Sequence, residues 1–149
     1  MRMALRYQQT TMGGREYNRI RDAWPGHDGL PGYTMEPDGK KKMQYGHGIG
    51  SNYWDLLPIG WDDMYATSQY YAAVKTMVEV EEAIAAHPGW DVPGGALALA
   101  PDELRAHAAA VKKTANELFW NDKTGRFVAC IDKNGNAHDY NARERIGDA

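Results

Sequence analysis

The sequence predicts a mainly α-helical protein, with a helical hairpin between a long aromatic loop and a small β-hairpin. Three observations carry this prediction. Apolar residues recur at spacings of three and four over residues 64–86 and 101–120, the period of an amphipathic helix. Residues 22–61 show neither a helical nor a strand period, and they are rich in Gly, Pro, Tyr and Trp. Asn134-Gly135, a strong signal for a tight turn, lies between two short strand-like runs.

Composition and charge limit the classes of protein to which the chain can belong. Its 149 residues are 43% hydrophobic with a net charge of −3, which suits one globular domain better than a disordered chain. Without a basic excess, nucleic acid is not an expected partner. The sequence has no apolar run of the roughly 18 residues that a membrane helix needs, and no secretory signal. As written, it therefore indicates a cytoplasmic protein that does not cross a membrane.

The first part of the chain, residues 1–61, combines a weak helical signal with the aromatic segment. A few apolar residues indicate a short helix over residues 1–9, and Gly13-Gly14 interrupts it. The segment that follows contains three turn signals: Trp24-Pro25-Gly26, Leu30-Pro31-Gly32 and Pro37-Asp38-Gly39. A stretch of this length with so many aromatic residues is expected to be an ordered loop that shapes a surface.

The first long helix is predicted over residues 64–86. Asp62 or Asp63 can cap its N-terminus, and His87-Pro88-Gly89 ends it. Its apolar stripe consists of Ala66, Tyr70, Ala73, Met77, Val80 and Ile84, and is widened by Tyr71, Val74 and Val78. The side expected to face water carries Glu79, Glu81 and Glu82.

The second long helix begins at Pro101, whose fixed φ suits a first turn, and it ends near Trp120. Its predicted apolar stripe consists of Leu104, Ala108, Val111, Ala115, Leu118 and Phe119. Together the two helices, within residues 62–120, have more apolar surface than they can bury against each other. The chain is therefore expected to form a homo-oligomer or to be part of something larger.

Residues 121–140 are predicted to form the β-hairpin, and the polar residues 141–149 a fraying tail. Residues 126–132 read as one strand that is apolar on both sides, and residues 137–140 as its return strand. Asp132 to Asn136 resembles the start of a calcium loop, but its glycine is at the fourth position, so a tight turn is predicted. The histidines and the single Cys130 lack zinc-type spacing. No metal or cofactor is expected.

Chemistry-bearing residues gather between residues 46 and 61. The glycines around His47 lack the strand, helix and spacing of a dinucleotide loop, so they are interpreted as places where backbone passes close to a ligand or another segment. Asp55 follows Tyr53 and Trp54 directly. An aspartate there can hydrogen-bond sugar hydroxyls beside a stacking ring, or protonate a glycosidic oxygen. It can equally be a turn or cap residue.

The order of these blocks is similar to that of a known family. Gly-Ser-Asn-Tyr-Trp-Asp-Leu-Leu-Pro over residues 50–58, followed by a glycine, an acidic pair and a Tyr-Tyr-Ala-Ala helix, resembles bacterial members of the six-hairpin glycosidase superfamily. That superfamily is related to glucoamylases, trehalases, rhamnosidases and glycogen-debranching enzymes. Later blocks, Phe119-Trp120-Asn121, Thr124-Gly125-Arg126-Phe127 and His138-Asp139-Tyr140, look like the family's helix end, hairpin and return strand. The resemblance covers roughly residues 1–140.

The resemblance implies an (α/α)6 toroid with its active site in the loops at one end. The expected reaction is cleavage of a glycosidic bond by one carboxylic acid and one carboxylate, and the expected ligand is an oligosaccharide or glycoside. Asp55 would be the catalytic or sugar-contacting acid. The implied substrate-binding residues are Tyr53, Trp54 and Trp61, with Asn52, His47 and Asp139 as further candidates.

A complete toroid needs more than twice this length, so residues 1–149 are expected to form a single partial toroid domain that can be inactive without its remainder. Two alternatives stay open. The first is a sugar-binding module without chemistry. The second is a helical interaction or assembly module in which Tyr65, Tyr70, Tyr71 and Trp90 form a packing or dimer surface.

Overall fold

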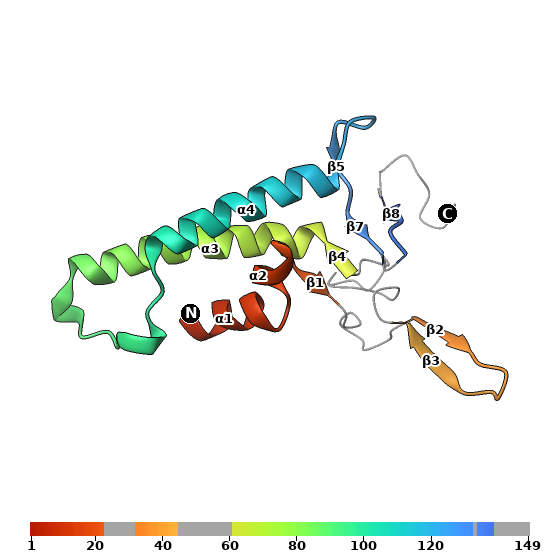
Figure 1. Ribbon diagram of the computed structural model, residues 1–149, viewed down its shortest axis with the longest axis horizontal. Helices are drawn as coiled ribbons and strands as arrows, with labels where there is room; N and C mark the ends of the chain where they lie inside the picture. Colours follow the sequence, from red (N-terminus) through yellow and green to blue (C-terminus); the bar gives the residue numbers. More distant parts are fainter. Residues whose placement is uncertain (23–31, 45–60, 133, 139–149) are drawn as a thin grey trace.

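The computed structural model describes residues 1–22, 32–44, 61–132 and 134–138. Two antiparallel helices, α3 (Met64–Ala86) and α4 (Pro101–Phe119), form a long arm (Figure 1). The short helices α1 (Arg2–Thr10) and α2 (Gly14–Tyr17) lie along one side of this arm, and short strands gather at one end of it. The predicted mainly helical class is confirmed.

Both long helices begin and end where the sequence indicates. Asp63 caps α3, because its Oδ1 accepts a hydrogen bond from the amide of Ala66 at 2.9 Å. At the other end, the amide of His87 bonds to the carbonyl of Ile84, and the chain turns into the connector. Two 3-10 turns follow there, η1 (Pro88–Trp90) and η2 (Gly95–Leu97), before Pro101 opens α4.

The main hydrophobic core lies between α3, α4 and α1. It consists of Leu5, Ile20, Tyr70, Val74, Met77, Val78, Leu104, Ala108 and Val111. A second, smaller core of Ala115, Phe119 and Val128 joins the end of α4 to the strands. Because the two cores follow one stripe of α4, the helical arm and the strand end form one packed body.

Gly14 lies at a close approach between α2 and α3. A Cβ there would lie 2.6 Å from Cζ of Tyr70 and 2.8 Å from the carbonyl oxygen of Gln8. Gly13 adopts φ +74°, so the glycine pair ends α1 and also starts α2. Burial raises the pKa of Tyr70 to about 12, and its hydroxyl lies 2.6 Å from Nε2 of His107.

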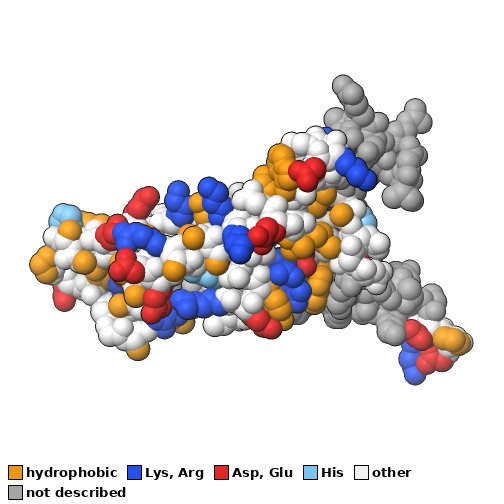
Figure 2. Space-filling view, turned by 45° about the horizontal axis from the view of Figure 1, so that its top comes forward, with side chains coloured by type: hydrophobic (Ala, Val, Ile, Leu, Met, Phe, Trp, Pro, Cys, Tyr) orange, Lys and Arg blue, Asp and Glu red, His pale blue; other side chains and the backbone are white. Residues whose placement is uncertain are grey.

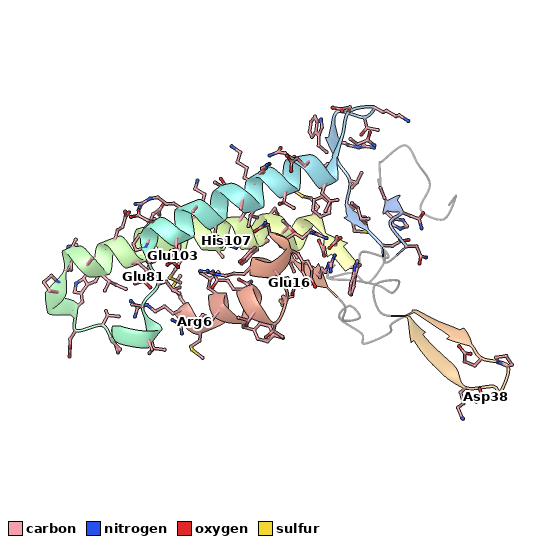
Figure 3. The ribbon with its side chains drawn as sticks, in the orientation of Figure 1. Arg6, Glu16, Asp38, Glu81, Glu103 and His107 are labelled. Atoms are coloured by element: carbon pink, nitrogen blue, oxygen red, sulfur yellow. The ribbon has the colours of Figure 1, made fainter. Side chains whose placement is uncertain are left out.

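The predicted exposure of two helix residues, Glu81 and Leu118, is wrong. Glu81 was expected to face water but is buried, with 6% of its surface exposed, because α1 covers that side of α3 (Figure 3). Its two carboxylate oxygens accept hydrogen bonds from Nε and Nη2 of Arg2 at 2.5 and 2.6 Å. Leu118 was expected in the core but is 37% exposed, because Phe119 takes the inward position.

Glu81 gives the chain a predictable response to acid. The hydrogen bonds from Arg2 outweigh burial and hold the pKa of Glu81 below its ordinary value of 4.5. The folded state therefore binds this proton less readily than the unfolded state, and the pair stabilises the fold above about pH 4.5. That stability is lost as the pH falls through the lowered pKa.

The free energy of unfolding of the wild type is expected to fall between neutral pH and pH values below 4.5. We expect this fall to be smaller in Glu81→Gln, which lacks the titrating carboxyl. Urea unfolding at the two pH values measures it. Glu117→Gln, which changes an exposed glutamate of α4, is the matched control. Equal acid sensitivity in wild type and Glu81→Gln would contradict the prediction.

The strands within the described ranges form three small antiparallel sheets. The four-stranded sheet has the order β1 (Arg21–Asp22), β4 (Trp61–Asp63), β7 (Cys130–Ile131), β8 (Ala137–His138). The other two sheets each pair two strands: β2 (Gly32–Met35) with β3 (Lys41–Gln44), and β5 (Trp120–Asn121) with β6 (Arg126–Phe127).

The prediction of one continuous strand over residues 126–132 is wrong. It divides into β6 and β7, which belong to different sheets. The break arises because the amide of Val128 bonds to the carbonyl of Phe119, while the carbonyl of Ala129 accepts from Met64 at the start of α3. The hairpin turn itself is confirmed, since Gly135 has φ +85° and its amide bonds to the carbonyl of Asp132.

A second β-hairpin, β2–β3, lies within the segment predicted as one long loop, and that prediction is wrong for residues 32–44. Its turn is one of the predicted signals, Pro37-Asp38-Gly39, with Gly39 at φ +79°. Backbone bonds across Glu36 and Lys40 close the turn, so the hairpin depends on turn chemistry and not on an alternating apolar pattern. Among the described helices, none is long and apolar enough to cross a membrane.

Candidate functional site

The two strands that flank the aromatic segment lie side by side. β1 precedes it and β4 follows it, and they pair with Arg21 opposite Asp62 and Asp22 opposite Trp61. β4 in turn leads directly into α3 (Figure 1). The two ends of a stretch of about 40 residues are therefore held side by side, at the end of the helical arm where the strands gather.

An ion cluster around one buried carboxylate holds these two strands together. Asp62 is 6% exposed and pairs with two arginines of the β1 region. Its Oδ2 accepts a hydrogen bond from Nη2 of Arg19 at 3.0 Å, and its Oδ1 accepts from Nε of Arg21 at 2.9 Å. Nε of Arg19 lies 2.6 Å from Oδ1, an ion pair without hydrogen-bond geometry. Among the residues that the structure describes, the cluster sets one carboxylate against two guanidinium groups.

Two aromatic rings lie near Arg21, the more exposed arginine of this cluster. The guanidinium carbon of Arg21 lies 3.7 Å from the ring centroid of Tyr17 and 5.1 Å from that of Trp61, both within cation–π distance. Trp61 adopts φ +73°, a conformation rarely found for a bulky residue. Such an angle needs support from its surroundings, and the contact with Arg21 is part of that support.

The acidic pair that begins the helix is engaged in structural contacts. Asp63 has no exposed surface, and its side chain caps α3. Its amide also bonds to the carbonyl of Ile20 at 3.2 Å, beside β1. With Asp62 held by arginines and Asp63 held by the helix, the pair positions the loop ends and does not offer a free acid for chemistry.

A second polar cluster lies across the sheet, in the turn between β7 and β8. Burial raises the pKa of Asp132, but hydrogen bonds from Asn136, His138 and the amide of Asn134 outweigh it and hold the pKa of that carboxyl well below its usual range. Nε2 of His138 lies 3.1 Å from Oδ2 of Asp132. Asp132 therefore caps this turn, and the tight turn predicted at these residues is confirmed.

Of the predicted site residues, the structure places Trp61 alone. It is half-buried beside Arg21 at the base of the aromatic segment. The predicted catalytic residue and the remaining binding candidates lie outside the described residues: Asp55, His47, Asn52, Tyr53, Trp54 and Asp139. The polar tail at residues 141–149 lies outside them too.

The sequence analysis missed Tyr17, Arg19 and Arg21, which complete the base of the segment. A usable signal was present, because two arginines spaced by two residues precede the aromatic segment and an acidic pair follows it. Opposite charges on both sides of a long insertion favour pairing of the flanking strands. Arg21 opposite Asp62 is the register that this signal indicates.

Within the described ranges, no group of three or more His, Cys, Asp or Glu side chains is arranged to hold a metal ion. No family model, no curated protein and no solved structure matches this chain.

Proposed function

We propose that this chain is a carbohydrate-active part of an α/α toroid of the six-hairpin glycosidase type, with its sugar site at the strand end of the helical arm. The supporting observation is that β1 and β4 hold both ends of the aromatic segment together, beside the start of α3. Loops that emerge at one end of helical hairpins are where the resemblance implies the active site. The proposed sugar site therefore consists of the Asn-Tyr-Trp-Asp block, supported by the paired strands β1 and β4.

The described residues at that base have the chemistry of a support for a sugar site. Tyr17 and Trp61 combine a flat apolar face with a polar edge, the combination that suits stacking on sugar rings and hydrogen bonding to hydroxyls. Arg21 fixes both rings, and Asp62 fixes Arg21. A cleft built on this base would keep its aromatic wall in a constant position while a ligand binds.

The reaction that goes with this proposal is hydrolysis of a glycosidic bond. It needs one carboxylic acid to protonate the leaving oxygen and one carboxylate to activate water or attack the sugar. Asp55 is the proposed acid, and Asp139 is a sugar-binding candidate. The engagement of Asp62 and Asp63 in an ion cluster and a helix cap favours a second candidate function, a sugar-binding module without turnover.

Thermal unfolding in the presence of oligosaccharides tests the binding part. A ligand that binds the native state alone raises the midpoint, by an amount set by its concentration relative to Kd. We expect one class of oligosaccharide to raise the midpoint, and Trp54→Ala to reduce that shift. Trp90→Ala, which changes an exposed tryptophan of the connector, is the matched control. An unchanged midpoint with every sugar class would contradict the proposal.

Turnover separates the two candidate functions. If the chain hydrolyses the sugar that stabilises it, Asp55→Asn is expected to abolish product formation while keeping the thermal shift. A thermal shift without product in the wild type would identify the module without chemistry. Full turnover in Asp55→Asn would remove Asp55 from the reaction.

A further inference from the structure

The helical arm is covered on one flank and open on the other. Glu81, Glu103 and His107 lie on the flank that faces α1 and α2 (Figure 3). Arg2 bonds to Glu81, and Arg15 lies 3.8 Å from Glu103. The opposite flank of the arm meets none of the described residues of α1 or α2, and a groove of about 490 Å³ runs there between α3 and α4.

The aromatic stripe proposed from the sequence is not this open surface. Tyr70 has no exposed surface and belongs to the core, whereas Tyr65 and Trp90 are exposed near opposite ends of α3. Tyr71 alone of the four residues lines the groove. The floor of the groove is otherwise aliphatic, with Val78 from α3 and the small residues Ala108 and Ala109 from α4.

Charged side chains surround this floor, and their sign differs between the two ends of the groove. Lys75 and Lys112 lie toward one end, and Glu79, Glu82 and Arg105 toward the other. Arg105 and Glu82 form an exposed ion pair between the two helices. The first end thus carries two positive charges, and the second carries two negative charges and one positive, a net of −1. Figure 2 shows side chains of both signs over the arm.

We propose that this groove is the contact surface between two copies of the chain, related by a two-fold axis perpendicular to the helices. That axis reverses the direction of the second arm, so the Lys75–Lys112 end of one copy meets the Glu79–Glu82 end of the other at both ends of the contact. An axis parallel to the helices would instead bring equal charges together. The charge order therefore selects one arrangement, a bundle of antiparallel helices.

The size of the flank suits a weak contact. The 19 residues of α4 are about 28 Å long, and two helices side by side are roughly 20 Å wide, which gives a footprint of roughly 560 Å², below the ~800 Å² per partner of a standard interface, so a dimer that dissociates on dilution is expected. Ala109 is small and exposed, so a facing helix can approach closely, and the partly exposed Tyr71 can supply an apolar contact. Val78 and Ala108 lie beneath them and belong to the main core. The inference does not depend on a sugar site at the other end of the arm.

Sedimentation equilibrium of the whole chain, over a wide concentration range and at low salt, tests the proposal. The wild type is expected to show a mass twice that of the chain at high concentration. Lys75→Glu/Lys112→Glu makes both ends negative, and Glu79→Lys/Glu82→Lys makes both positive. Each variant alone is expected to raise the dimer Kd at least tenfold, because like charges now face each other.

Mixing the two variants provides the decisive comparison. The all-negative and all-positive grooves are complementary, so a heterodimer is expected to form although neither variant associates with itself. Lys40→Glu/Lys123→Glu makes the same charge change on exposed turns away from the groove, and it is expected to dimerise as the wild type does. Helical circular dichroism shows that each variant is folded.

Three outcomes would overturn the proposal: a wild type that remains a monomer at every concentration, charge-reversed variants that dimerise like the wild type, or a mixture that fails to associate. A monomer that still shows a sugar-dependent thermal shift would leave the proposed function intact, so the two proposals fail separately.

Discussion

Replacing Asp62 by alanine is expected to lower the free energy of unfolding by about 3–5 kcal/mol. The carboxylate is buried and is shared by Arg19 and Arg21, so its removal leaves two adjacent guanidinium groups without their counter-charge. Removing one partner of a buried ion pair lowers the free energy of unfolding more than removing one partner of an exposed pair. The reason is that the remaining charge is less well solvated. Urea unfolding followed by circular dichroism measures the change.

The matched control is Asp102→Ala. Its side chain is 97% exposed and also pairs with an arginine, Arg105, so it removes the same chemical group from a solvated ion pair. We expect a loss below about 1 kcal/mol. A loss of equal size in both variants would contradict the assignment of Asp62 as a buried anchor.

A further variant separates uncompensated charge from lost packing. Substituting all three members, as Arg19→Met/Arg21→Met/Asp62→Leu, removes the unpaired charges together with the carboxylate. Replacing a whole buried ion cluster by apolar residues is often neutral, so we expect this variant to regain most of the stability lost in Asp62→Ala. A triple variant as unstable as Asp62→Ala would show that the cluster acts through its shape and not its charge.

The same anchor bears on the sugar site. Because the guanidinium of Arg21 lies within cation–π distance of both Tyr17 and Trp61, loss of Asp62 releases the cation that contacts the two rings. If the proposed cleft is built on this base, Asp62→Ala is expected to weaken oligosaccharide binding under conditions in which the variant is still folded. The helical circular dichroism signal shows whether the variant is folded under those conditions.

Local signals in the sequence predicted the helical arm well. Asp63 caps α3 and Pro101 opens α4, and both act through contacts within one turn of the chain. The turns at Gly39 and Gly135 were predicted for the same reason, since each needs a positive φ that glycine adopts easily. Features that depend on one to four neighbouring residues can be read directly from the order of residues.

Features that depend on distant partners were missed or misplaced. The burial of Glu81 requires Arg2, which lies 79 positions earlier, and no helical period reports that contact. The division of the predicted strand at Val128 and Ala129 requires the carbonyl of Phe119 and the amide of Met64. The base of the candidate site likewise depends on Arg19 and Arg21 meeting Asp62 across the aromatic segment.

Adjacent positions at the end of α4 show the limit of periodicity most directly. Leu118 and Phe119 follow Ala115 by three and four residues, so the sequence pattern places both on the buried stripe. In the structure Phe119 has no exposed surface and packs with Ala115 and Val128, whereas Leu118 is 37% exposed. The difference arises because Val128, Met64 and Ile131 pack against the Phe119 side of the helix end.

We therefore expect Phe119→Ala to lower the free energy of unfolding by about 3–5 kcal/mol, and Leu118→Ala by less than about 1 kcal/mol. The first change opens a cavity where Met64 and Ile131 also pack, so it loosens the contact between α4 and the four-stranded sheet. The second removes a side chain that keeps much of its contact with water. Urea unfolding of the two variants under identical conditions gives the comparison.

The Phe119→Ala result also reports on how the two ends of the molecule depend on each other. Phe119 belongs to the smaller core, while the main core lies along the arm around Tyr70 and Leu104. If the body unfolds as one unit, near-ultraviolet and far-ultraviolet circular dichroism should shift together to the same lower midpoint. If the far-ultraviolet signal keeps the wild-type midpoint, the strand end unfolds separately from the helical arm, and a sugar site built there would depend on the smaller core alone.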